Sequence, residues 1–512
     1  MGMQNIVLKN RTLTNAVMSR IPSGSHAKRG EKYALGVVEA ALRRTRAYPD
    51  YIKCEGLSVD AVSDMSAFRR LPVIDKRLYV DRYPLSDLAL DGSPSSAYTI
   101  EKSSGHSGGS YYWLRLAEED AIFPQYLEHA FVQFYKIDTM PTLVLITLAL
   151  GTWTSGEKMA QALRQVAASG KYPLTVMAPG TNVEEILEIV ADIGALYAQT
   201  IIVGYPPFVK TVIDEGTRRG LDWPSLHVKI GLGGEGYSEP WREHMASVIG
   251  VDPDADLLAV SGGYGAADVG MSIGREYAAT VMIRKLCVAK PDLARDLFSV
   301  RNGQSGMLPN LLQYNPASCY IEEVGDELVF TALSGIPLVR YNIHDNGGVI
   351  TFDRAMEILG DHGCDLYGEL ARRGYGPEQV WKLPFFYVYG RTDGTVSIVG
   401  ANVFPQNIQA VLSESRDQDI VTFKLAVETT PSFSQRLVIS LEHNAHELSE
   451  EQETALSADY YKKLVDGLRC TNADFRDAHD DNPEAADPIV RVHARGTGPF
   501  AEHRGIKYRY TV

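Results

Sequence analysis

The sequence predicts an α/β protein, with a large N-terminal domain of doubly wound sheets and helices and a small α+β C-terminal domain. The chain has 512 residues, too many for one ordinary hydrophobic core. Between residues 140 and 275, apolar runs such as TLVLITLAL and QTIIVG alternate with amphipathic segments such as GEKMAQALRQVAAS. Such alternation is typical of a largely parallel sheet covered by helices. Near residue 391 the pattern changes to short strands and single helices.

Individual elements of the large domain follow from local signals. The segment EKYALGVVEAALRRTRAY has apolar residues at helical spacing, so the first hundred residues are predicted to be mostly helical. A further helix is predicted over 183–193, with Thr181 or Asn182 as its N-cap. From about residue 300, the runs CYIEEV, ELVFTAL and GGVITF predict strands.

The C-terminal part begins with VSIVGANVFPQNIQAVL, which predicts a hairpin that leads into a helix. The runs FKLAVET and RLVISLEH predict paired strands, and a helix is expected at about 448–467. The acidic stretch DAHDDNPEAAD is interpreted as a loop. We therefore expect two domains, residues 1–390 and residues 391–512.

Composition excludes several classes of partner. The net charge is −14, and clustered lysines and arginines, which duplex nucleic acid requires, are not indicated. Five cysteines lie far apart, which argues against a zinc site or a disulfide framework and favours a cytoplasmic setting. The longest apolar run, at 143–150, is too short to span a membrane and is interpreted as a buried strand.

Three glycine-rich stretches are candidate ligand loops. SSGHSGGS at 103–110 combines hydroxyl groups with glycines that let backbone amides converge on an anion. It lacks the Lys-Ser/Thr ending of a Walker A loop, and a solvated linker is the alternative. GLGGEG at 231–236 and SGGYGAADVG at 261–270 both follow apolar strands, where α/β proteins bind ligands. Each one alone is also compatible with an ordinary tight turn.

Three further segments carry charged candidates. IPLVRYNIHD ends in Asp345, a carboxylate at a predicted strand end that could accept bonds from both hydroxyls of a ribose. Arg391 and Asp393 lie at the expected domain boundary. The tail RGIKYRY contains Lys507, although a lone terminal lysine is usually a solvated charge.

Taken together and in this order, the six motifs resemble the adenylate-forming superfamily, which comprises AMP-forming acyl-CoA synthetases and adenylation domains. The resemblance is greatest to the branch of phenylacetate–CoA ligases and coenzyme F390 synthetases, and it extends from about residue 60 to the C-terminus. ALGTWTSGEKM, VGYPPFVKTVIDEG and PLVRY are the features of that branch.

The resemblance implies a role for each motif. The nucleotide would be bound by residues of all the glycine-rich stretches and of the ribose segment: Ser103, Ser104, Gly105, His106, Ser107, Gly108, Gly109, Gly233, Gly234, Glu235, Tyr264, Gly265, Ala266, Ala267, Asp345 and Arg391. Asp268 would help to hold Mg²⁺, and the catalytic groups would be Lys507, Asp268 and Arg391. Asp393 would be the hinge of the small domain.

Three departures from the family pattern affect these assignments. His106 stands where the family usually has Thr or Ser, and Gly109 stands where a lysine is common. Asp268 replaces a more usual glutamate. The family's catalytic lysine follows a glycine directly, whereas here Ile506 separates Gly505 from Lys507.

The activity implied by the resemblance is ATP-dependent, AMP-forming activation of a carboxylic acid, followed by transfer of the acyl group to an acceptor. ATP and Mg²⁺ are implied, with CoA as the expected co-substrate. Two alternatives are a ligase with a non-CoA acceptor and a non-catalytic nucleotide-binding homologue. The expected partners are small molecules, with no nucleic acid and no membrane, and a homodimer is left open.

The acid is expected to be aromatic or compact. Trp153, Tyr205 and Phe208 lie where this branch lines its acid pocket, together with Gly262 and Gly263. The alternative for the three aromatic side chains is ordinary core packing.

Overall fold

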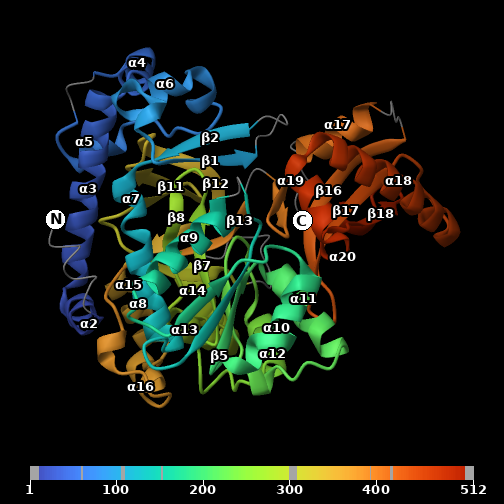
Figure 1. Cartoon of the computed structure of the whole chain (residues 1–512). Helices are drawn as coiled ribbons and strands as arrows, with labels where there is room; N and C mark the ends of the chain where they lie inside the picture. The colour runs from blue at the N-terminus through green and yellow to red at the C-terminus, as the bar shows by residue number, and fades with distance from the viewer. Residues whose placement is uncertain are drawn as a thin grey trace.

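A mixed sheet of eleven strands runs through the larger part of the computed structural model (Figure 1). The structure describes residues 11–58, 62–104, 110–151, 154–298, 308–391, 394–414 and 419–501. In spatial order the strands are β10 (Tyr320–Val324), β11 (Glu327–Ala332), β12 (Leu338–Ile350), β13 (Phe385–Arg391), β9 (Asn310–Tyr314), β8 (Gly270–Arg275), β7 (Val260–Ala266), β6 (Lys229–Leu232), β5 (Gln199–Gly204), β3 (Thr142–Thr147) and β4 (Leu174–Met177).

The half of the sheet from β4 to β7 is parallel, as the alternation of strands and helices predicts. Every residue of β3 and β5 is buried, which explains their continuous apolar sequences. From β8 to β10 the strands are antiparallel. Asp345 lies inside the long strand β12, not at a strand end, because the chain continues in extended form to Ile350.

Helices pack on the parallel half, with α9 on β3 and β4, α11 on β5 and α12 on β7. Asn182, one of the two predicted N-caps, accepts a bond of 3.1 Å from the amide of Glu185. The helices of this region are α7 (Ala117–Asp120), α8 (Phe123–Tyr135), α9 (Thr154–Ala168), α10 (Val183–Ile193), α11 (Pro206–Arg218), α12 (Glu239–Val248), α13 (Ala278–Ala289), α14 (Pro291–Phe298), α15 (Phe352–Asp361) and α16 (Leu366–Ala371).

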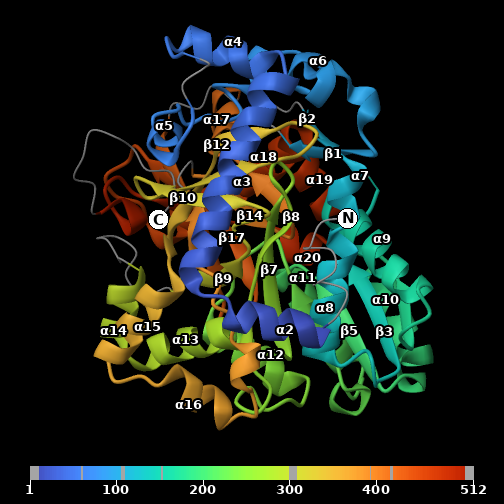
Figure 2. The same ribbon diagram turned by 90° about the vertical axis from the view of Figure 1, so that its left-hand side faces the viewer.

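The N-terminal hundred residues are mostly helical, as predicted, and they cover one side of the antiparallel half (Figure 2). The longest of these helices packs against β10, β11 and β12. A separate hairpin, β1 (Thr99–Ser104) with β2 (Ser110–Arg115), follows them. The N-terminal helices are α2 (Arg11–Arg20), α3 (Ser23–Arg44), α4 (Ala47–Cys54), α5 (Met65–Arg69) and α6 (Leu85–Leu88).

The C-terminal segment forms a lobe beside the large sheet (Figure 1, orange and red). It contains a hairpin, β14 (Val396–Ile398) with β15 (Ala401–Val403), and a three-stranded sheet. That sheet consists of β16 (Ile420–Thr429), β17 (Gln435–His443) and β18 (Ile489–His493). Its helices are α17 (Pro405–Glu414), α18 (Glu450–Thr471), α19 (Ala473–Asp481) and α20 (Pro483–Ala486).

The acidic stretch DAHDDNPEAAD was interpreted as a loop, and this is wrong, because it forms most of α19 and all of α20. Asn472 accepts a bond of 2.9 Å from the amide of Phe475 and so caps α19. Pro483 stands at the first position of α20, where a proline is tolerated. Acidity alone therefore did not distinguish a loop from capped helices.

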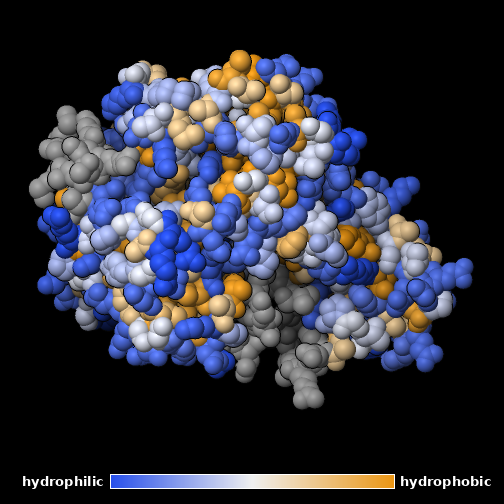
Figure 3. Space-filling model, turned by 90° about the horizontal axis from the view of Figure 1, so that it is seen from below, coloured by the Kyte–Doolittle hydropathy of each residue, from blue (hydrophilic) through white to orange (hydrophobic). Residues whose placement is uncertain are grey.

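None of the described helices is long and apolar enough to cross a membrane. Seen from below, the surface is largely hydrophilic, and its hydrophobic residues lie in scattered groups (Figure 3).

Candidate active site

A cavity of about 1960 Å³ lies where β6 and β7 end and where the C-terminal lobe meets the large sheet. Pockets for a single small ligand are usually about 300–1,000 Å³. Its lining includes Ser397, Gly400 and Asn402 of the hairpin β14–β15, so both parts of the chain contribute to it. One wall is a stripe on α8 at helical spacing, formed by Phe123, Leu127, Phe131 and Tyr135.

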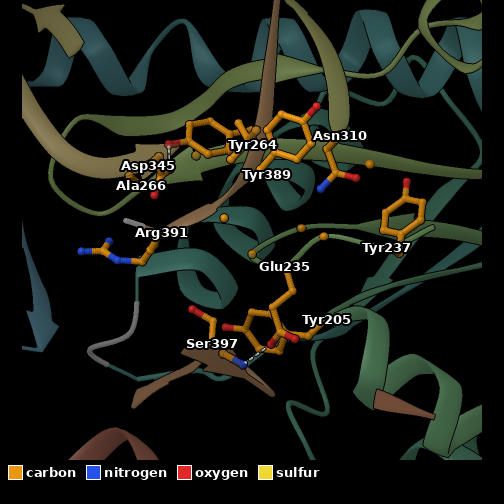
Figure 4. Close-up of a pocket in the computed structure, with 18 of the residues that line it drawn as sticks. Tyr205, Glu235, Tyr237, Tyr264, Ala266, Asn310, Asp345, Tyr389, Arg391 and Ser397 are labelled. Atoms are coloured by element: carbon orange, nitrogen blue, oxygen red, sulfur yellow. Dashed lines mark hydrogen bonds between the residues drawn. The ribbon is translucent and has the colours of Figure 1, made fainter. Parts of the chain in front are cut away.

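Tyr264, Asp345 and Arg391 form a group on one side of the cavity (Figure 4). The ring of Tyr264 stacks on Phe330, with centroids 6.1 Å apart, and its hydroxyl donates to the carboxylate of Asp345. Burial, reinforced by that carboxylate, raises the pKa of Tyr264 well above its ordinary value. Asp345 and Arg391 are paired in register on β12 and β13. The structure thus brings together three residues from motifs far apart in the sequence.

Asp268 is buried at the end of the cavity beyond β7. Its carboxylate accepts a bond of 2.7 Å from the hydroxyl of Tyr341 and forms an ion pair of 3.2 Å with Lys76. The Lys76 ammonium also lies 5.1 Å from the ring centre of Tyr111 on β2. The carboxylate that was assigned to Mg²⁺ therefore has a lysine beside it.

This end of the cavity is also the candidate metal site. Within the described ranges, no three His, Cys, Asp or Glu side chains group so that they could hold a metal ion. Asp268 provides one carboxylate. This fits Mg²⁺, which is commonly held by one or two carboxylates together with phosphate oxygens and water.

Glu235 lies across the cavity and contacts the C-terminal lobe. Its Oε1 accepts a bond of 2.7 Å from the amide of Gly400, in the turn of the β14–β15 hairpin (Figure 4). Burial raises the pKa of Glu235 to about 7, and the amide bond opposes that rise. Gly234 has a φ of +83°, which favours glycine, and a Cβ there would lie 2.8 Å from the ring of Tyr205. The GGE segment therefore joins the large sheet to the small lobe.

The three aromatic residues predicted to line the acid pocket have different positions in the structure. Tyr205 lines the cavity and its hydroxyl lies 2.8 Å from that of Ser155. Phe208 is fully buried in the core and does not line the cavity, so the alternative of core packing holds for it. Trp153 lies outside the described residues. Gly262 and Gly263 both line the cavity, and the amide of Gly262 donates to Glu276 over 2.7 Å.

The remaining candidates fall into two groups. Ser103 on β1 lines the cavity and accepts a bond of 2.9 Å from the indole of Trp113. Ser104 ends β1, and Gly233, Gly265, Ala266 and Ala267 line the cavity. Besides Trp153, seven predicted residues lie outside the described ranges: Gly105, His106, Ser107, Gly108, Gly109, Asp393 and Lys507.

A buried ionic network supports the floor of the cavity. Glu276 accepts bonds from Arg242, at 2.5 Å, and from the hydroxyl of Tyr237. Arg242 and Arg284 also pair with Glu239. This network holds Glu276 and Tyr237, both of which line the cavity, in fixed positions.

The sequence analysis did not single out Lys76, Arg275, Tyr237 or Glu276, although all of them line the cavity. Lys76 follows the short segment LPVID, which has no motif character of its own. Arg275 and Glu276 follow the end of the SGGYGAADVG motif by five and six residues, so extending that motif along β8 would have included Arg275.

No family model matches the chain. Phenylacetate-coenzyme A ligase of Aromatoleum evansii is 20% identical over 242 residues, which are 46% of this chain and 43% of that protein. The matching region thus spans less than half of that relative.

Solved structures match nearly the whole chain. One is 2-hydroxyisobutyryl-CoA ligase in complex with 2-HIB-AMP and CoA in the thioesterification state. It is 13% identical and covers 97% of this chain and 91% of its own, with a TM-score of 0.59. An open conformation of the same ligase covers 96% and 92%, with a TM-score of 0.52. The fold of adenylate-forming ligases, which the motifs implied, is confirmed.

Proposed function

We propose that this chain activates a carboxylic acid with ATP, forming an acyl adenylate and pyrophosphate, and then transfers the acyl group to the thiol of CoA. The observation that carries this proposal is the convergence of Tyr264, Asp345, Arg391 and Asp268 on one cavity. These residues come from three separate motifs, and the likeness to a CoA ligase fold supports the same activity.

In this proposal the nucleotide is bound by residues that line the cavity. The carboxylate of Asp345 accepts bonds from the ribose hydroxyls, and the Tyr264 ring, held between Phe330 and Phe386, offers a flat surface for the base. Arg391, beside Asp345, neutralises developing negative charge. Ser103 and the glycine-rich loop that follows it bind the phosphates.

Asp268 is the residue that holds Mg²⁺ in this proposal. When bound, the ion neutralises charge on the phosphate oxygens. Lys76 pairs with the carboxylate of Asp268 and holds it in position.

The first half-reaction depends on positioning. A carboxylate oxygen of the acid attacks the α-phosphorus, and pyrophosphate leaves with the electrons of the broken P–O bond. The nucleophile is already an anion, so no general base is required, and the cavity acts by holding the reactants in line. The product is a mixed anhydride, which a thiolate attacks readily with release of AMP.

CoA is the acceptor that the comparisons favour. The thioesterification state of that ligase has a TM-score of 0.59 to this chain, against 0.50 to 0.52 for an open conformation and two post-adenylation complexes. In this chain the hairpin β14–β15 contacts Glu235 at the cavity. In the proposal, residues 391–512 are the mobile domain that takes this position for the second half-reaction, and Asp393 is its hinge. The setting proposed is the cytoplasm.

The test is ATP–pyrophosphate exchange with a panel of aryl and short-chain acids, each with and without Mg²⁺. We expect acid-dependent, Mg²⁺-dependent exchange, and consumption of CoA thiol when CoA is added. If AMP is released but the CoA thiol is not consumed, the acceptor is a molecule other than CoA. If no acid gave exchange or AMP, the proposed function would be wrong, and a non-catalytic nucleotide-binding protein would remain.

A further inference from the structure

Arg275 lies at the inner end of the cavity, where no motif predicts a function. It pairs with Gly263 in the β7–β8 ladder, and paired residues project from the same face of a sheet. Ser261, two residues before Gly263, projects from that face too, and its hydroxyl lies 3.1 Å from that of Tyr135 on α8. Gly231 pairs with Ser261. Arg275 and Ser261 therefore lie on the same face of the sheet, and this face is directed toward α8. The same part of the sheet contains the glycines Gly231 and Gly263.

The surroundings of the Arg275 guanidinium are aromatic. Its carbon lies 5.7 Å from the ring centre of Phe134, and Tyr135 and Tyr277 are its other close neighbours. Burial lowers the pKa of Arg275, although a guanidinium stays protonated at neutral pH. The Arg275 guanidinium is therefore a cation packed against aromatic rings, and the cavity is the side from which a polar partner can reach it.

Three arginines that are buried in the structure, unlike the partly buried Arg275, have carboxylate partners. Arg242 pairs with Glu239 and Glu276, Arg284 pairs with the same two carboxylates, and Arg115 pairs with Glu101. Across the part of the chain that the structure describes, Arg275 forms no ion pair and no side-chain hydrogen bond. The adjacent Glu276 is held by Arg242, Arg284 and Tyr237. An uncompensated charge beside an apolar wall is unfavourable even where it is only partly buried, as Arg275 is, so this arrangement suits a ligand that brings an anion.

We propose that Arg275 binds a second anionic group of the acid substrate, and that the preferred acid is a dicarboxylate with its two carboxylates separated by a rigid spacer. The inference rests on the proposed function, and it takes the reacting carboxylate to lie near Asp268, the residue proposed to hold Mg²⁺. Gly263, the partner of Arg275, precedes Ala266 by three residues, about 10 Å along the strand. A benzene ring with carboxyl groups at opposite positions holds two carboxylates rigidly apart and is therefore the probe of this arrangement.

The experiment compares matched acids in matched variants. Benzoate and terephthalate form one pair, and phenylacetate and 4-carboxyphenylacetate form the other. Wild type is expected to show a kcat/KM about 10–100-fold higher for the dicarboxylate of each pair, because charge-assisted hydrogen bonds are lost with the monoacid. Arg275→Met should abolish or reverse this preference, and Arg275→Lys should keep part of it. Arg43→Met, at an exposed position on α3, is the control and should behave as wild type.

Two outcomes separate the inference from the proposed function. Acid-dependent exchange without a preference for dicarboxylates in wild type would overturn the role of Arg275 and leave adenylation standing. If no acid supports exchange, calorimetric titration with terephthalate decides the anion site by itself. Binding to wild type that Arg275→Met weakens at least tenfold supports the site, and equal or undetectable binding overturns it. Should Arg275→Met fail to fold, Arg275→Gln and Arg275→Lys carry the same comparison.

Discussion

The hydroxyl of Tyr264 donates a hydrogen bond to the carboxylate of Asp345. A ribose bound as proposed would therefore share this acceptor with the tyrosine. We expect Asp345→Ala to lower kcat/KM for ATP about 30–150-fold, equivalent to about 2–3 kcal/mol, because two charge-assisted bonds are lost. Steady-state kinetics with ATP as the varied substrate measure this. Tyr264→Phe keeps the ring and removes only the donor, so it should cost much less. Near-normal kinetics in a folded Asp345→Ala protein would exclude the ribose role.

Glu235 makes stability depend on pH in a direction that can be worked out. Its pKa is about 7 in the folded protein, against an ordinary value of 4.5, so between these values the folded state binds more protons than the unfolded state. The free energy of unfolding therefore falls as pH rises through this range. Glu235→Gln lacks the effect while it can still accept the Gly400 amide bond.

We expect the Tm of Glu235→Gln to equal that of wild type near pH 4.5 and to exceed it by about 1–4 °C at pH 8. Thermal melts across pH 4.5–8 provide the measurement. Glu357→Gln, at an exposed position on α15, is the control. Parallel pH profiles for Glu235→Gln and wild type would mean that Glu235 titrates normally.

Individual site residues were predictable where a motif carried them, and Tyr264, Asp345 and Arg391 meet although 127 residues separate the first from the last. Residues whose role depends on strand register were not predictable. Arg275 faces the cavity because it pairs with Gly263, and Lys76 reaches Asp268 from a segment without a motif. Phe208 shows the opposite case, since a residue next to a motif lies in the core.

The turn of the β14–β15 hairpin is the element that joins the two parts of the site. Val399 and Gly400 both have positive φ, at 51° and 79°, as a two-residue turn of type I′ requires. A Cβ on Gly400 would lie 2.6 Å from the ring of Tyr205. Gly400→Ala should therefore displace the hairpin from the cavity.

We expect Gly400→Ala to slow acyl transfer to CoA about 10–100-fold, in line with the 1–3 kcal/mol typical of overpacking, and to leave ATP–pyrophosphate exchange nearly unchanged. The two half-reactions are measured separately. Gly374→Ala is a matched control, because Gly374 has a φ of +81° and open space around its Cβ position. If the two variants behaved alike, backbone strain and not the Tyr205 contact would be responsible.

Elements with a strong period were predictable and elements with mixed signals were not. The parallel strands were predicted correctly because both of their faces are buried, which makes their apolar runs continuous. The segment RYNIHD and the first four residues of GGVITF belong to the single strand β12, whereas Phe352 begins α15. Polar residues of β12 lie along the cavity, and its glycines pack against Tyr387 of β13. Helices α19 and α20 were not predicted, because the acidic composition of the stretch suggested a loop although Asn472 and Pro483 mark the starts of the two helices.

For the molecule as a whole, the α/β fold with an added C-terminal lobe was predictable, whereas the pose of that lobe was not. Its position depends on single contacts such as that from Gly400 to Glu235, which no sequence pattern encodes. The proposed mechanism requires a second pose, in which Lys507 reaches the α-phosphate. Lys507 and Asp393 both lie outside the described residues, so the rotation is tested by kinetics.

Lys507→Ala is expected to slow adenylate formation about 10²–10³-fold, as for loss of one preorganised charge-stabilising group, and to leave transfer from a pre-formed acyl adenylate nearly intact. Asp393→Pro is expected to do the reverse if the hinge must change its backbone angles, because proline fixes φ. Synthetic acyl adenylate with CoA measures the second step alone. Equal damage to both steps in both variants would rule out rotation about Asp393 while leaving adenylation itself possible. An unaffected Lys507→Ala would instead move the charge to another residue of the tail, with Arg504 and Arg509 as the next variants to measure.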